Sequence, residues 1–96
     1  MALLDKDQIK KAVESQKLSD WKLGEKEINR QFVLKDFGQA MAFVNSVAVA
    51  AEEANHHPDI LIEWNKVSFK LSTHDAGGLT EKDFNLAEKI NGLAPV

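Results

Sequence analysis

The sequence has no cysteine and no apolar run as long as the roughly 20 residues that a membrane helix needs. The absence of cysteine excludes disulfides, thiolate catalysis and cysteine-ligated zinc sites. Basic residues are outnumbered, because 12 lysines and arginines stand against 15 aspartates and glutamates and leave a net charge of -3. This balance argues against direct binding to nucleic acid or to an anionic membrane. With no charged leader before an apolar stretch, we expect a cytoplasmic protein.

What is present is an ordinary globular composition, with 44% hydrophobic and 28% charged residues among 96. A chain of this length predicts one domain, residues 1–96, with one modest core. No linker, low-complexity tract or strong internal repeat interrupts the sequence.

Three places carry the signature of a helix start, in which a capping residue is followed three positions later by a side chain that bonds back. These pairs are Asp5 with Gln8, Asp36 with Gln39, and Thr80 with Asp83. They predict a short first helix, a long helix over about 37–55 and a last helix that begins after Thr80. A proline at position 58 marks the end of the long helix.

Two hairpins are predicted between these helices, because apolar and polar residues alternate there as in half-buried strands. The first covers 21–34 with a turn at 24–27, and the second covers 60–73 with Asn65-Lys66 as its two-residue turn. The order αββαββα therefore predicts an α+β fold, a single four-stranded antiparallel sheet with helices packed on one face.

The long helix is apolar on more than one side. The side that we expect to lie on the sheet carries Phe37, Ala40, Met41, Val44, Val47, Ala48 and Ala51. The opposite side carries Ala42, Phe43, Val49 and Ala50, and is too apolar to face water. We expect another copy of the chain to cover it, the alternative being a second helix of the same chain.

The three histidines lie at the ends of predicted elements, where sites are usually built. His56 and His57 follow the long helix, and Glu52 stands one helical turn before His56, where its carboxylate can orient the imidazole. On the last strand, alternation places His74 on the polar side together with Ser72. Because imidazole has an ordinary pKa of about 6.5, such a cluster suits the donation and acceptance of protons at neutral pH.

Other interpretations of these residues stay open at this point. Histidines at a helix C-terminus also interact favourably with the helix dipole, although this does not account for His74. Glu52 and the histidines are suitable metal ligands, but adjacent side chains that enter an X-Pro segment tend to diverge. A nucleophilic Ser72 paired with His74 would have to close a backbone distance of about 7 Å. Asp83 is a helix-capping carboxylate before it is a ligand contact.

The segment Glu52-Glu53-Ala54-Asn55-His56-His57-Pro58 resembles the signature of the pterin-4a-carbinolamine dehydratase family, whose mammalian members also act as dimerisation cofactors of a homeodomain transcription factor. That family has an acidic residue four positions before His-His-Pro, followed at fixed spacing by an aromatic residue, a histidine and an aspartate. In this sequence the pattern is met by Glu52, His56, His57, Pro58, Trp64, His74 and Asp83. The likeness covers about residues 18 to 91.

The resemblance implies dehydration of 4a-hydroxytetrahydrobiopterin, the 4a-carbinolamine, to quinonoid dihydropterin and water in tetrahydrobiopterin recycling. It implies no metal and no organic cofactor. The implied catalytic residues are His56 and His74 as the acid and the base, His57, which holds the substrate and assists, and Glu52, which orients His56 and raises its basicity. The implied substrate contacts are Asn55, His56, His57, Ser72, Thr73, His74, Asp75 and Asp83.

The resemblance also implies partners. Dimers are expected to extend the sheet at its edge, and tetramers to pack their long helices together. A transcription factor or an aromatic amino-acid hydroxylase is an implied partner, and a non-catalytic dimerisation module for transcription is the alternative function. Two residues depart from familiar members: Asn55 replaces a common aspartate, and Trp64 replaces a common tyrosine.

Overall fold

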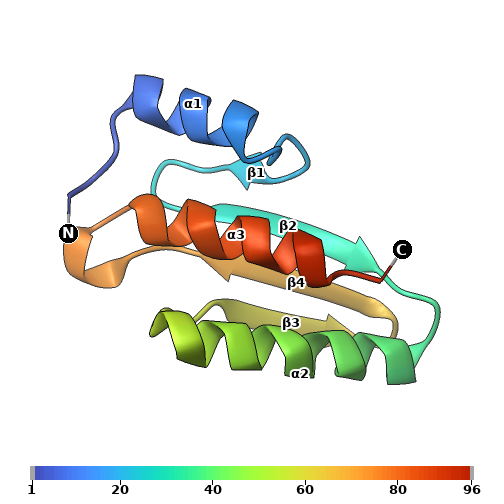
Figure 1. Cartoon of the computed structure of the whole chain (residues 1–96). Coiled ribbons are helices and arrows are strands. Elements are labelled where there is room, and N and C mark those ends of the chain that lie inside the picture. Colours follow the sequence, from blue (N-terminus) through green and yellow to red (C-terminus); the bar gives the residue numbers. More distant parts are fainter. Residues whose placement is uncertain (1, 96) are drawn as a thin grey trace.

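The structure is a computed structural model that describes residues 2–95 (Figure 1). Its helices are α1 (Lys6–Ser15), α2 (Phe37–Ala54) and α3 (Glu81–Leu93), and its strands are β1 (Lys22–Leu23), β2 (Ile28–Val33), β3 (Asp59–Glu63) and β4 (Lys66–Leu71). The strands form one antiparallel sheet in the order β1-β2-β4-β3. The predicted αββαββα order and α+β class are confirmed. Within residues 2–95, no helix has the length and apolarity to cross a membrane.

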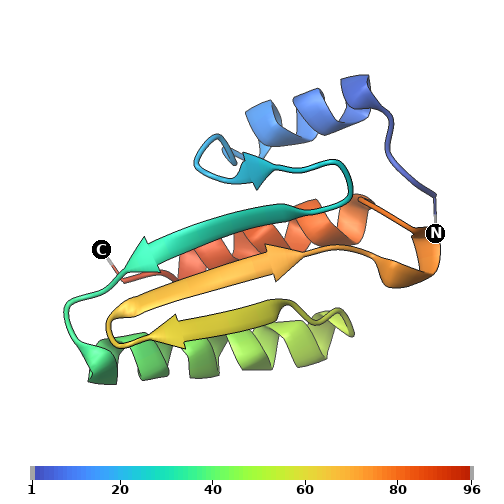
Figure 2. The same cartoon turned by 180° about the vertical axis from the view of Figure 1, so that it is seen from behind.

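The sheet is covered on one face only. Helices α2 and α3 lie on that face (Figure 1), and the view from behind shows the strands uncovered (Figure 2). Helix α1 lies beside β1 at the edge of the sheet in both views. The half-buried side chains that pack α1 and its entry segment against the core are Leu4, Ile9, Ala12 and Val13.

The predicted helix starts are confirmed. Asp5 and Thr80 each open a helix with both bonds of a capping box. Asp36 caps α2 by accepting the Gln39 N–H at 2.8 Å, whereas the Gln39 side chain accepts the N–H of Lys35 instead of that of Asp36. The second bond of this box is therefore displaced by one residue, and α2 still begins at Phe37.

The orientation of α2 differs from the prediction. Its buried residues are Ala40, Phe43, Val47, Ala50 and Ala51. Phe43 and Ala50 thus lie in the core and not on the outer side, while Phe37 is 51% exposed. Because α2 is apolar nearly all round, periodicity alone does not fix which side packs inward. The ring of Phe43 meets Phe32 and Phe69 edge to face, at centroid distances of 5.0 and 5.4 Å, and this cluster sets the orientation.

The turn of the second hairpin also lies one residue earlier than predicted. Glu63 pairs with Lys66, so the turn residues are Trp64 and Asn65. Trp64 has the left-handed φ of 57° that such a turn requires. Asn65 fixes the register, because its side-chain N–H and its carbonyl both bond to the backbone of Leu34 at the end of β2, at 3.0 and 2.7 Å.

Candidate active site

A hollow of about 380 Å³ lies at the end of β4, on a scale typical of small-molecule sites. His57 reaches it from the segment after α2, and His74 reaches it from a short 3₁₀ helix, His74–Ala76, that follows β4. The complete lining is Lys26, Glu27, His57, Asp59, Lys70, Ser72, His74 and Gly77. The fold therefore brings two of the three predicted histidines to one hollow from separate elements.

The end of α2 decides where His56 and His57 lie. Asn55 adopts the left-handed conformation, with φ 49° and ψ 43°, and the His56 N–H returns to the Ala51 carbonyl at 3.1 Å. This is the bond pattern with which helices commonly end, and asparagine tolerates it better than most residues. The chain turns sharply at Asn55. The side chain of His56 is only 10% exposed, whereas that of His57 is 58% exposed.

The predicted partnership between Glu52 and His56 is wrong. The Glu52 carboxylate contacts Nε2 of His57, and both side chains are largely exposed. The prediction assumed that helical spacing continues through residue 56, but α2 ends at Ala54 and Asn55 reverses the backbone. His57, and not His56, consequently lies beside the carboxylate.

His56 has a different carboxylate partner. Its Nε2 lies 2.6 Å from Oδ1 of Asp83, which is in the first turn of α3. Asp83 is wholly buried and His56 is nearly so. An imidazole held by a buried carboxylate is a common arrangement for a histidine that takes up a proton, because the carboxylate orients the ring and stabilises the imidazolium.

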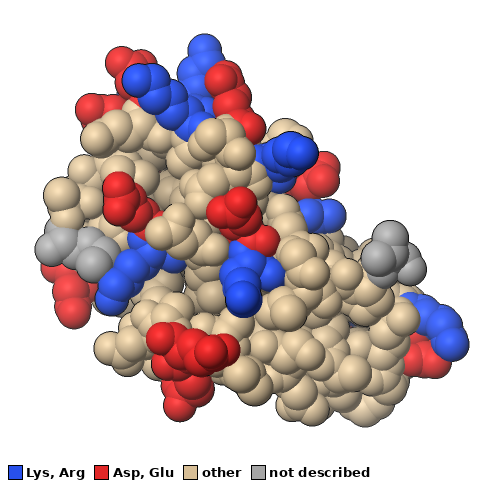
Figure 3. Space-filling model, viewed as in Figure 1, with Lys and Arg blue, Asp and Glu red and all other residues tan. Residues whose placement is uncertain are grey.

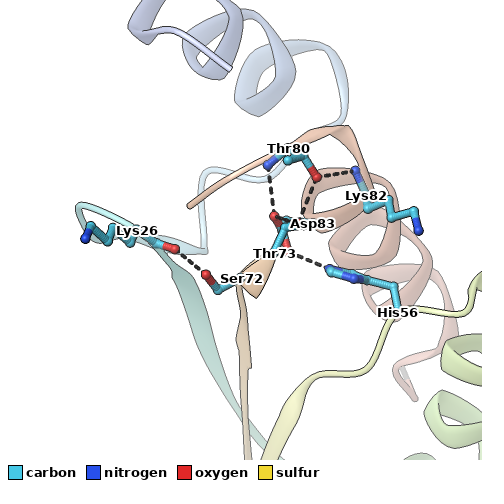
Figure 4. Close-up of polar contacts among 7 residues, drawn as sticks. All are labelled: Lys26, His56, Ser72, Thr73, Thr80, Lys82 and Asp83. Carbon is cyan, nitrogen blue, oxygen red and sulfur yellow. Dashed lines mark hydrogen bonds and ion pairs between the residues drawn. The ribbon is translucent and has the colours of Figure 1, made fainter. Parts of the chain in front are cut away.

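Asp83 is held in turn by two threonines (Figure 4). Its Oδ2 accepts the hydroxyl of Thr73 at 2.7 Å and the backbone N–H of Thr80 at 2.9 Å. Because Asp83 has no exposed surface, its predicted direct contact with substrate does not fit this geometry. The carboxylate instead holds His56 while it caps α3.

Ser72 reaches the hollow but its hydroxyl is already engaged. It donates to the Lys26 carbonyl at 2.6 Å and so ties the turn before β2 to the end of β4 (Figure 4). The lining residues that the sequence did not single out as site residues are Lys26, Glu27, Asp59, Lys70 and Gly77. Asp59 and Lys70 are paired across β3 and β4, with Oδ2 of Asp59 3.7 Å from Nζ of Lys70. The register of these two strands would have identified the pair.

The other predicted contacts lie near the hollow in sequence but do not line it. Asn55 and Asp75 are exposed beside His56 and His74, and Thr73 is buried. The side chains of the alternative metal site, Glu52 and the three histidines, do not converge on one point, since Glu52 pairs with His57 while His56 contacts Asp83. Within residues 2–95, no group of three or more histidine or carboxylate side chains has an arrangement suited to a metal ion.

In comparisons with known proteins, the family model and the curated relatives indicate the same family. The family model described as pterin 4 alpha carbinolamine dehydratase matches residues 2–93. A curated relative from Acidobacterium capsulatum, whose name includes pterin-4-alpha-carbinolamine dehydratase, is 55% identical over 85 residues that cover 86% of this chain and 92% of the relative. A relative from Nocardia farcinica with the same name is 50% identical over 92 residues, covering 96% and 95%.

Solved structures share the fold. A transcriptional coactivator/pterin dehydratase from Brucella melitensis has a TM-score of 0.89 at 33% identity and covers 97% of this chain and 99% of its own. A pterin dehydratase-like protein identified as a RuBisCO assembly factor in the alpha-carboxysome has a TM-score of 0.68 at 24% identity, covering 78% and 89%, and supports the fold alone. Since the family model spans nearly all the described residues, this chain belongs to the pterin-4-alpha-carbinolamine dehydratase family, a family of hydro-lyases.

Proposed function

We propose that this protein removes water from a 4a-hydroxytetrahydropterin and releases a quinonoid dihydropterin. The observation that carries the proposal is the position of His57 and His74, which come from separate elements and line one hollow in a chain of the dehydratase family. The biological substrate that we propose is 4a-hydroxytetrahydrobiopterin, formed when aromatic amino-acid hydroxylases use tetrahydrobiopterin.

The reaction moves two protons and needs no redox partner. The bond between C4a and its hydroxyl oxygen breaks, and the oxygen leaves as water after it receives one proton. The adjacent ring nitrogen loses one proton, and its electron pair forms the new double bond to C4a. Imidazole suits both steps, because it donates and accepts protons near neutral pH.

We assign the two proton transfers to His74 and His56. His74 is exposed at the hollow and protonates the leaving hydroxyl. His56 accepts the proton of the ring nitrogen, and Asp83, 2.6 Å away, stabilises the imidazolium that results. His56 is not among the residues that line the hollow, and its side chain is 10% exposed. In this assignment the exposed part of the imidazole faces the bound pterin.

His57 and Glu52 hold the substrate in this proposal. Glu52 lies against one ring nitrogen of His57, which fixes the orientation of the imidazole at the hollow. Ser72 shapes the wall through its bond to Lys26, and Asn55 and Asp75 supply contacts at the rim. Thr73 acts from inside the protein, through Asp83.

The test is the decay of freshly generated 4a-hydroxytetrahydropterin, followed by absorbance with the purified chain and in buffer alone. The proposal expects faster decay with the wild-type chain and a rate close to that of buffer with His74→Gln. A wild-type rate equal to that of buffer would end it. Purified His74→Gln must show the same circular dichroism and Tm as wild type, so that lost activity is not lost folding.

Self-association is the second part of the proposal. Figure 3 shows that the surface over the middle of α2 carries no charged side chain. Ala42, Ala48 and Val49 are exposed there, and Val49 is 61% exposed. An uncharged helix face of this kind is typical of a protein interface. We assign it to contact between copies of this chain, with a sheet-edge contact as the second interface.

A non-catalytic role in transcription is the alternative function. The Brucella melitensis relative is described as both a transcriptional coactivator and a pterin dehydratase. A coactivator role alone predicts that His56→Ala and His74→Ala leave partner assembly unchanged and that the wild-type chain does not accelerate dehydration. The absorbance assay therefore separates the two functions.

A further inference from the structure

Four polar side chains form a continuous hydrogen-bonded chain inside the protein (Figure 4). They belong to His56, Thr73, Thr80 and Asp83, which come from three separate segments, and each of these residues as a whole is at most 9% exposed. The two hydroxyls lie 2.8 Å apart, Thr73 Oγ1 lies 2.7 Å from Asp83 Oδ2, and Asp83 Oδ1 lies 2.6 Å from His56 Nε2. Each of the four side chains has a hydrogen-bond partner within this network, as buried polar side chains nearly always do.

The direction of each bond follows from the number of hydrogens. Thr73 has a single hydroxyl hydrogen, which it gives to Asp83, so the contact between the two threonine hydroxyls is donated by Thr80. Thr80 Oγ1 in turn accepts the backbone N–H of Lys82 at 3.3 Å. The chain thus runs in one direction, from Thr80 through Thr73 to the carboxylate.

The carboxylate has only acceptor positions to offer to its neighbours. Oδ2 accepts the Thr73 hydroxyl and the Thr80 N–H, and Oδ1 faces the His56 ring. Since Oδ1 can only accept, the contact between Oδ1 and His56 is a hydrogen bond when Nε2 of His56 carries the hydrogen. The other ring nitrogen, Nδ1, makes no hydrogen bond to any residue between 2 and 95 and then holds a free lone pair.

From this network we propose that Thr73 is a positioning residue that fixes His56 in the tautomer with the proton on Nε2. The inference rests on the proposed function, because it explains how Nδ1 of His56 is prepared to accept a proton. Thr73 acts through Asp83: its hydroxyl bonds to that carboxylate, and Thr73 is not among the residues that line the hollow. Loss of its hydroxyl leaves Oδ2 with the Thr80 N–H alone, and the carboxylate is then free to turn away from the imidazole.

The backbone of Thr73 gives this residue a second connection to the site. Its carbonyl accepts the N–H groups of Ala76 and Gly77, at 3.1 and 3.0 Å, which close the 3₁₀ turn that begins at His74. Its N–H donates to Gly78 at 2.9 Å. One residue therefore holds the partner of His56 with its side chain and the turn that carries His74 with its backbone.

A purely structural role is the competing explanation, because Thr80 and Asp83 form the capping box of α3. Removing a buried hydroxyl then lowers stability but leaves the His56 tautomer unchanged. The tautomer is observable, since protonated and unprotonated ring nitrogens have well separated ¹⁵N chemical shifts. Spectra recorded at increasing pH, until the ring shifts of His56 no longer change, report its neutral form.

The experiment compares wild type, Thr73→Val and Thr73→Ser by ¹⁵N NMR of the histidine rings and by dehydration kinetics. His56 is assigned from spectra of His57→Gln and His74→Gln. We expect the Nε2-protonated form in wild type and in Thr73→Ser, and a mixture of tautomers in Thr73→Val. With Thr73→Val, kcat should fall about tenfold at an unchanged KM, as is usual when an orienting partner is lost, whereas Thr73→Ser should restore it.

Unchanged His56 ring shifts and unchanged kcat in folded Thr73→Val would overturn the proposal. So would a wild-type spectrum with the proton on Nδ1 of His56, a result that requires no Thr73 variant and remains decisive if Thr73→Val does not fold. The spectra do not depend on activity. If wild type fails to accelerate dehydration while the His56 tautomer responds as expected, the proposed function is wrong and the role of Thr73 stands.

Discussion

Oδ1 of Asp83 lies 2.6 Å from Nε2 of His56, and this buried contact joins the C-terminal end of α2 to the N-terminal turn of α3. The two residues are 27 positions apart in the chain. The same carboxylate completes the capping box of α3 with Thr80, so the start of one helix and the orientation of a histidine depend on one side chain. Asp83 stands in the first turn of α3, and a helix is a rigid support for the side chain that holds His56.

The first prediction concerns Asp83→Asn. An amide keeps one acceptor oxygen where the carboxylate has two, so either His56 or the Thr73 and Thr80 donors lose their partner. We expect kcat to fall about 100-fold, within the usual range for acid–base assistance. The free energy of unfolding should fall by about 1–3 kcal/mol, because a buried donor is left unpaired. Stopped-flow dehydration and urea denaturation measure the two effects.

Glu81→Gln is the matched control for this substitution. Glu81 is also a carboxylate in the first turn of α3, but it is exposed. The Glu81→Gln substitution should leave kcat unchanged. Wild-type kcat in Asp83→Asn would remove the role assigned to the His56–Asp83 pair.

A second prediction separates Glu52 from His56. Since Glu52 contacts His57, which we assign to substrate binding, Glu52→Gln should raise KM about fivefold, the equivalent of about 1 kcal/mol for one hydrogen bond. We expect kcat to stay near wild type, and Glu53→Gln, at the neighbouring exposed carboxylate, to change neither constant. Steady-state kinetics decide the matter. A large loss of kcat at an unchanged KM would assign Glu52 to the chemical step instead.

The third prediction tests the turn at Asn55. A left-handed residue with a Cβ costs about 1–2 kcal/mol, a cost that is lower for asparagine and absent for glycine. Asn55→Ala should therefore lower the free energy of unfolding by about 1 kcal/mol, whereas Asn55→Gly should be as stable as wild type or more so. Urea denaturation compares the three chains. Equal stability of Asn55→Ala and wild type would mean that the helix does not need this conformation.

The fourth prediction addresses self-association through α2. We expect wild type to sediment as a species larger than the monomer at micromolar concentration, and Val49→Lys to shift towards the monomer because a charge then enters the apolar face. Ser15→Lys, at the exposed end of α1, adds the same charge elsewhere and should behave as wild type. Analytical ultracentrifugation provides the measurement. A monomeric wild type, or a Val49→Lys chain that associates as strongly as wild type, would contradict this interface.

Much of the fold was predictable from the sequence because its signals are local. Capping residues such as Asp5 and Thr80 bond within their own turn, and strand alternation needs only neighbouring residues. The predicted exposure of His74 is also confirmed, although β4 ends at Leu71 and His74 belongs to the 3₁₀ helix that follows, not to the strand. In contrast, the orientation of α2 depends on Phe43 meeting Phe32 and Phe69, a contact between distant segments that periodicity does not encode.

The site was predictable in its residue types but not in its pairing. The Glu52 partnership failed at Asn55, where a single left-handed residue ended the helical spacing. The Asp83 contact with His56 joins two helix ends, and only the packing of α2 against α3 brings them together. In the sequence, helix capping alone accounts for Asp83, so its second contact, with His56, was not predicted.

The most direct test of this account is the dehydration rate of 4a-hydroxytetrahydropterin with His56→Ala, His57→Ala and His74→Ala, each compared with wild type and with buffer. We expect His56→Ala and His74→Ala to lose kcat by about 100-fold or more, and His57→Ala to keep more of its kcat with a raised KM. Wild-type kcat in folded His56→Ala would contradict the claim that the His56–Asp83 pair moves a proton in the reaction.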